Sequence, residues 1–256
     1  MGHERLGVLP RTKCWVRIIE DLGAFDTGEA AIGDIARATL RNVDARFRQV
    51  HRDTGVQAAF SFLVALPLGA RGGETAKTLL GIDLAVNPSS LTLAGSLKRW
   101  VSLNRCSMEH GGIAERAALD AIAFWLAQHG REGLFGPRPA REIWAEASTG
   151  AGFSELARSF FSGFTQRYLK YFLDRAASAE INTLEARERF ELLLHNHVDD
   201  ISKHAFEISA ITQSFAAGWF SKRAPSDMPP DREIREFLSV AFGKIREEIL
   251  REVDGP

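Results

Sequence analysis

The sequence predicts an all-α fold, a multi-helix bundle of about eight or nine helices with a long helix in the C-terminal half. Apolar residues recur every three or four positions through most of the chain, which is the period of an amphipathic helix. The clearest example is a stripe with alternating spacings of four and three residues. It consists of Leu194, Val198, Ile201, Ala205, Ile208, Thr212, Phe215 and Trp219. Such a period keeps one helix face on a partner helix over several turns, so the stripe predicts a helix-helix seam.

Two amphipathic helices are predicted in the first part of the chain. The first covers 10–22, and Gly23 follows it where a left-handed C-terminal cap ends many helices. The second begins after Asp26 or Thr27, which are both good N-cap residues, and continues until Gly55.

The stretch 57–103 is the least regular part of the sequence. It contains an apolar run over 58–68, a Gly-rich turn over 69–73 and two further helical pieces. A short strand near 60–66 is the alternative interpretation of the apolar run. The run is interrupted by Pro67 and is shorter than the roughly 20 residues that span a bilayer. No membrane insertion is therefore expected.

A loop rich in Gly and Pro, over 133–139, follows a helix that Gly130 closes. It is the best candidate for an internal boundary, but it is too short to be a linker. The sequence therefore predicts a single helical domain over 1–256. The alternative is a subdivision into an N-terminal helical part, 1–135, and a C-terminal helical bundle, 138–256.

The part after this loop is predicted to be almost entirely helical. Aromatic residues crowd one helix over 153–172, which indicates contacts on several sides. A capping pair at Asn182 opens a helix that could continue unbroken to Arg223, about 40 residues or roughly 60 Å. This long helix is expected to pack lengthwise on the aromatic one. A last amphipathic helix covers 234–249.

Composition limits the compartment and the classes of partner. The net charge of −1 predicts no global attraction to nucleic acid or to acidic membranes. Only Cys14 and Cys106 are present, outside any CxxC pattern, which argues against a disulfide framework or a cysteine zinc site. The first residues lack the basic and apolar regions of a signal peptide. Because most of the basic residues are arginine, as in many GC-rich bacteria, we expect a bacterial cytoplasmic protein.

Three polar residues of the striped segment form a candidate metal site. His197, Asp200 and His204 share one narrow helix face, and imidazole with carboxylate is a common ligand set for divalent metals. Asp199 or His195 would then support the ligands or transfer protons. The alternative is a structural role, because polar residues at these spacings also flank any apolar seam.

Four arginines form a candidate surface for acidic partners. Their spacings place them on one face of the second helix, over about 22 Å. They are Arg37, Arg41, Arg48 and Arg52. Such a strip could bind nucleic-acid phosphates or the carboxylates of a protein. However, Asp44 lies in its middle, which favours a solvated face with internal ion pairs.

No catalytic motif is complete. The turn at 69–73 resembles a phosphate-binding loop in order only, since that motif requires glycine directly before the lysine and Ala76 precedes Lys77. The chain also lacks a GxSxG elbow, an SxxK pair and an HExxH pair. We therefore favour a non-catalytic interaction or assembly subunit of a bacterial cytoplasmic complex, without a cofactor, that binds a protein partner or a second copy. A metal-dependent helical enzyme and a nucleic-acid-binding protein are the alternatives.

Overall fold

The computed structural model describes residues 13–25, 30–104, 108–130, 138–181, 183–207, 213–224 and 227–251. Within these ranges the side chains of 14, 108–109, 174–180, 203–207 and 213–215 are not described.

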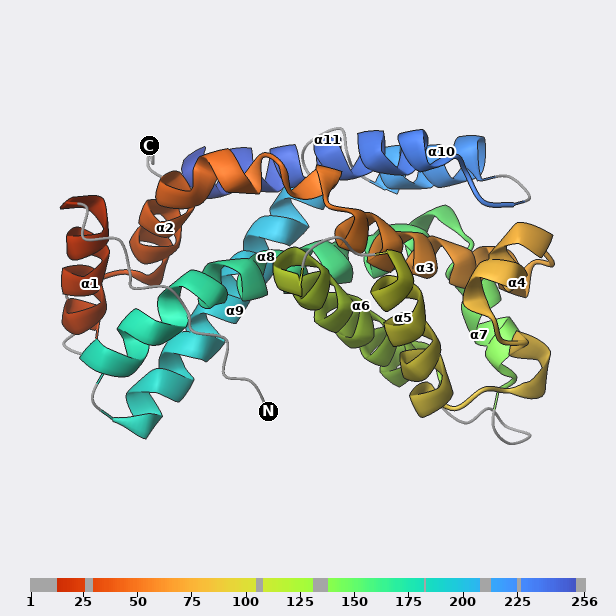
Figure 1. Ribbon diagram of the computed structural model, residues 1–256, viewed down its shortest axis with the longest axis horizontal. Helices are drawn as coiled ribbons and strands as arrows, with labels where there is room; N and C mark the ends of the chain where they lie inside the picture. Colours follow the sequence, from red (N-terminus) through yellow and green to blue (C-terminus); the bar gives the residue numbers. More distant parts are fainter. Residues whose placement is uncertain are drawn as a thin grey trace.

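The prediction of an all-α fold is confirmed (Figure 1). The described residues form eleven α-helices and two short 3₁₀ helices, and they contain no strand. The elements are α1 (Lys13–Phe25), α2 (Ile32–Phe47), η1 (Val50–Arg52), α3 (Thr54–Ala70), α4 (Glu74–Leu80), η2 (Leu84–Val86), α5 (Ser90–Asn104), α6 (Met108–His129), α7 (Ala140–Glu146), α8 (Gly150–Glu180), α9 (Leu184–Glu207), α10 (Gln213–Arg223) and α11 (Asp231–Arg251). The expected number of helices, eight or nine, was slightly too low.

The apolar run that allowed a strand near 60–66 is the central helix α3. Apart from Thr54 and Gln57, every residue of α3 is buried. The helices α4, α5, α6, α7, α8 and α11 all contact it. A helix that is covered on all sides has no polar face, so its sequence loses the 3.6-residue period. The strand alternative was wrong for this reason.

The helix predicted to run unbroken from 182 to 223 corresponds to α9 and α10, and residues 208–212, on which its continuity depends, lie outside the described residues. Both α9 and α10 pack along α8, so the lengthwise packing is confirmed. A straight helix drifts by about 20° per heptad from a 3.5-residue seam, or roughly 100° over 40 residues. Among the described side chains of α10 the buried ones are Ala216 and Phe220, whereas Trp219 of the stripe is only partly buried. The buried face of α10 is thus offset from the stripe.

One hydrophobic core contains residues from every helix between α1 and α11. Its centre is aromatic: the ring of Phe60 in α3 lies 5.5 Å from those of Phe160 and Phe161 in α8, and 5.3 Å from Phe237 in α11. The two parts proposed on either side of residue 136 therefore share this core. Partly exposed Trp219 of α10 packs on Phe237 and extends this aromatic core to the surface, where the candidate site lies.

Asp227, just before α11, caps the N-terminus of α4. Its carboxylate accepts hydrogen bonds from the backbone N–H of Thr75 at 2.9 Å and of Ala76 at 3.0 Å. Burial by itself raises the pKa of Asp227, but the hydrogen bonds from Thr75, Met228 and Ala76 outweigh it and hold the pKa below its ordinary value. These two backbone amides follow the Gly-rich turn that was compared above with a phosphate-binding loop. A carboxylate of the chain itself accepts their hydrogen bonds.

We expect Asp227→Ala to lower the free energy of unfolding by about 1 kcal/mol at neutral pH, because two N–H groups lose their acceptor. The folded pKa lies below the unfolded value of about 3.9. The ionised carboxylate therefore stabilises the fold above that value, and this contribution is lost as the pH falls through the folded pKa. Urea unfolding should show the difference between Asp227→Ala and the parent shrinking from about pH 5 downwards. As a control, Asp227→Asn keeps an acceptor but does not titrate. A difference that is constant down to acid pH would contradict this assignment.

Among the described residues, no single helix is long and apolar enough to cross a membrane. One bent pair, 32–52 followed by 54–70, passes the same test of length and composition, with 55° between its parts.

Candidate binding groove

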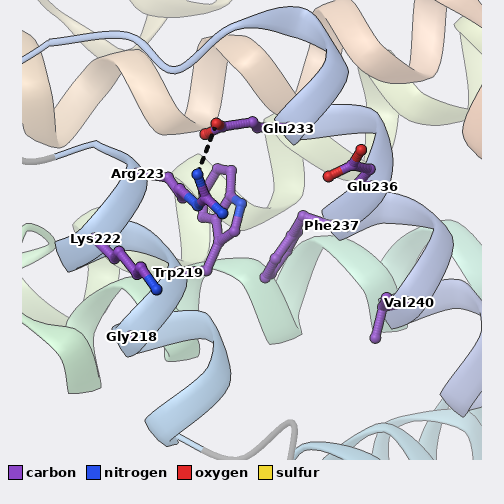
Figure 2. Close-up of a pocket in the computed structure, with 8 residues that line it drawn as sticks. All are labelled: Gly218, Trp219, Lys222, Arg223, Glu233, Glu236, Phe237 and Val240. Carbon is purple, nitrogen blue, oxygen red and sulfur yellow. Dashed lines mark hydrogen bonds and ion pairs between the residues drawn. The ribbon is translucent and has the colours of Figure 1, made fainter.

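A groove lies between α10 and α11 on the surface of the bundle (Figure 2). It encloses about 440 Å³, within the range of sites that bind small molecules or the side chains of a partner. The residues that line it are Gly218, Trp219, Lys222, Arg223, Glu233, Glu236, Phe237 and Val240.

The groove exists because α10 and α11 pack on different parts of the core. Helix α10 packs on α8, where the ring of Phe220 stacks on Phe153 at 4.4 Å. Helix α11 packs along α2, α3 and α9, and its Phe237 and Phe242 also reach the ring of Phe161 in α8. The two helices meet through side chains, with the rings of Trp219 and Phe237 4.6 Å apart. These side chains leave an open channel between the helices.

The floor of the groove is apolar and firmly held. Phe237 is 1% exposed and stacks on Phe60 in the core, while Trp219 also lies 5.9 Å from Phe153. Val240, one turn further along α11, is 40% exposed. Because the core fixes the rings from below, a ligand would meet a preformed surface and would not have to order it.

Gly218 forms part of the wall on the α10 side. A Cβ atom placed on this glycine would have no heavy atom within 4 Å. The backbone of α10 is therefore exposed to the groove, and a side chain at this position would extend into open space. Gly218 offers a way to fill the groove without disturbing the core.

Charged side chains form the rim (Figure 2). Arg223 of α10 donates to Glu233 of α11 at 3.0 Å, which ties the two helices together at one end. Glu236 pairs with Arg232, one turn before it, at 3.1 Å. Lys222, on the α10 side, is exposed and has no hydrogen bond or ion pair with any described residue.

The lining combines paired charges with an apolar floor. The carboxylates and the guanidinium of the rim are engaged in ion pairs, and the lining holds no histidine, cysteine, serine or threonine. An apolar floor with a few charges at its edge is the usual form of an anchor pocket for a partner's side chain.

The residues proposed as metal ligands lie on α9, where the structure describes only part of the site. His197 is half-buried and Asp200 is exposed, whereas the side chain of His204 lies outside the described residues. No group of three or more His, Cys, Asp or Glu residues in the described part of the chain is placed to hold a metal ion. The complete ligand set stays a prediction.

Asp199, which the sequence offered as a supporting residue of that site, joins α9 to α8. Its Oδ1 accepts from Nη1 of Arg158 at 2.7 Å and from the hydroxyl of Ser162 at 3.1 Å. Exposed His195 lies on the same helix. This carboxylate oxygen therefore accepts its hydrogen bonds at the interface between α8 and α9.

The four arginines of the candidate strip lie in different environments. Arg37 is 8% exposed and pairs with Asp34 at 2.7 Å, and Arg48 pairs with Asp44 at 2.8 Å. The other two, Arg41 and Arg52, are exposed, and Arg52 belongs to η1 beyond the end of α2.

Asp44 also accepts a hydrogen bond from Arg246 of α11, which is the main reason why its pKa lies below the ordinary value. Ion pairs within the chain therefore engage part of the strip. Binding of nucleic acid by this face stays a prediction.

The sequence contained two unused signals for the groove. Trp219 is the last residue of the apolar stripe. It is only partly buried, because the buried face of α10 is offset from the stripe. Val240 is apolar but lies off the apolar face of α11, which runs through Phe237, Ala241 and Ile245. Neither signal is specific, because single apolar residues are common on protein surfaces. The rim charges carried no signal either, because charged residues occur on every described α-helix except α3.

No family model, curated protein or solved structure matches this chain. The fold and the groove define a helical protein with a preformed apolar site on its surface.

Proposed function

We propose that this chain is a non-catalytic interaction subunit of a bacterial cytoplasmic complex and that its α10–α11 groove binds an amphipathic helix of a protein partner. The observation that carries the proposal is the rigid aromatic floor of the groove, where partly exposed Trp219 lies on buried Phe237, which the core supports. Large aromatic residues at the centre of a contact supply most of the binding energy in protein interfaces.

The shape of the groove supports a helix as the bound element. Two helices on either side of an apolar floor resemble the grooves into which amphipathic helices insert their apolar face. The position of the charges also fits this mode of binding. They form a rim around the apolar centre, as in most interfaces between proteins.

The experiment fills the groove from Gly218. We expect Gly218→Leu to fold normally, because its Cβ meets nothing within 4 Å and leucine favours a helix more than glycine does. The added side chain would occupy the place of the partner's anchor. Purification of the tagged chain from its native host, with quantitative mass spectrometry of bound proteins, should show a partner that is lost from this variant.

Gly95→Leu is the matched control. Gly95 also lies in a helix, α5, with no heavy atom within 4 Å of a built Cβ, and it is exposed. The control variant should therefore retain the partner at the level of the parent chain. Equal recovery of every bound protein by the two variants would contradict the proposed function.

A further inference from the structure

The charged residues on the rim of the groove include one cation, Lys222, that no carboxylate among the described residues pairs with. The pairs Arg223–Glu233 and Arg232–Glu236 each neutralise one cation with one carboxylate. Lys222, in the part of the chain that the structure describes, has no such carboxylate. Its ammonium group lies at the edge of the apolar floor, as Figure 2 shows beside Trp219.

Lys222 therefore favours one sign of charge on a bound helix. A partner carboxylate beside the apolar anchor would meet an ammonium group that, among the described residues, has no ion pair to break. A partner lysine at the same place would be repelled by Lys222, while Glu233 and Glu236 already pair with Arg223 and Arg232. Like charges brought together at an interface are a common source of specificity against wrong partners.

Resting on the proposed function, we infer that the groove selects an acidic amphipathic helix. The apolar face of this helix covers Trp219 and Val240 above the buried ring of Phe237, and its carboxylates lie beside Lys222. Contact with the aromatic floor supplies the affinity, and Lys222 determines the sign of the charge that the bound helix carries. Because Lys222 is exposed, its contribution decreases as salt screens the charges.

The test uses two synthetic peptides and the full chain. Both peptides are alanine-based helices of about 18 residues, long enough to be helical alone, with one apolar face of leucine and phenylalanine. They differ only in carrying glutamates or lysines beside that face. Binding is followed through the anisotropy of a dye attached to the same end of each peptide.

We expect the parent chain to bind the glutamate peptide at least about threefold more tightly than the lysine peptide at low salt. The variant Lys222→Glu should reverse this preference, and about 0.5 M salt should reduce it in both proteins. Gly218→Leu should bind neither peptide, whereas Gly95→Leu should behave like the parent chain.

Each other outcome has a definite meaning. Equal affinity for both peptides, with loss of both in Gly218→Leu, would overturn the selection of acidic helices and leave the proposed function standing. Binding that Gly218→Leu does not change, or no binding up to about 1 mM, weaker than specific complexes generally show, would overturn both. A dimer of the parent chain in native mass spectrometry that Gly218→Leu abolishes would show that a second copy fills the groove, and this would also overturn the inference.

Discussion

Phe60→Ala should lower the free energy of unfolding by about 3 to 5 kcal/mol, the usual cost of removing a buried phenylalanine ring. Phe60 is fully buried and touches aromatic rings of α8 and α11, including Phe153 and Phe237. Its removal leaves a cavity where three helices meet, and the surrounding rings cannot all move to fill it. Urea unfolding followed by circular dichroism measures the change directly.

Two controls separate the loss of packing from the substitution itself. Phe60→Leu keeps most of the buried volume and should cost clearly less than the alanine variant. Phe124→Ala removes the same ring from α6, where the side chain is 37% exposed, and should cost about 1 kcal/mol or less. If Phe60→Ala were no more costly than Phe124→Ala, Phe60 would not lie at the centre of the core.

The same ring supports the groove, since Phe60 stacks on Phe237 from the side of the core. Phe60→Ala should therefore also weaken partner binding, although Phe60 itself does not line the groove. Gly218→Leu has the opposite signature, because it blocks the groove without a loss of stability. A comparison of the two variants therefore distinguishes two effects on partner binding: a change in the shape of the floor in Phe60→Ala, and a block of access to the floor in Gly218→Leu.

The helical fold could be predicted because local spacing reports local structure. The amphipathic faces of α2 and α11 were visible as apolar residues at helical spacing, and apart from partly buried Ile32 the same residues are buried in the structure. Helix α3 was ambiguous for a physical reason, since a helix buried on all sides shows no period. The stripe did not predict which face of α10 is buried, because its described buried residues, Ala216 and Phe220, are one position out of step with the stripe.

The groove could not be predicted because it depends on where two helices pack and not on either helix alone. Trp219 and Phe237 are 18 positions apart, and each would serve equally well in an ordinary core. Nor does the spacing of residues disclose a contact such as that of Asp227 with the start of α4, about 150 positions away. The side chains of Asp44 and Arg246 likewise meet only after α2 and α11 have packed together. Contacts of this kind decide which charged groups are engaged within the chain and which remain for a partner.

The start of the central helix depends on one carboxylate, Asp53, so Asp53→Ala should also be strongly destabilising. Its Oδ1 accepts from the backbone N–H of Gly55 at 2.8 Å and of Val56 at 3.1 Å. Its Oδ2 lies 3.6 Å from Nδ1 of His110, which joins α3 to α6. Loss of an N-cap costs about 0.5 to 2 kcal/mol, and we expect the upper end because Gly55 and Val56 are buried and water cannot easily replace the acceptor.

Asp83→Ala is the matched control for this cap. Asp83 accepts from the backbone N–H of Ala85 at 2.9 Å, but it caps the short η2 in an exposed position, so its loss should cost only a few tenths of a kcal/mol. Asp53→Asn keeps an acceptor for the cap and removes the charge, so its cost measures what the charge contributes at the start of α3 and towards His110 of α6. Hydrogen exchange should show faster opening of the first turn of α3 in Asp53→Ala than in Asp53→Asn. If Asp53→Ala and Asp83→Ala were equally mild, the stability of α3 would come from its burial alone, and the cap would only mark where the helix begins.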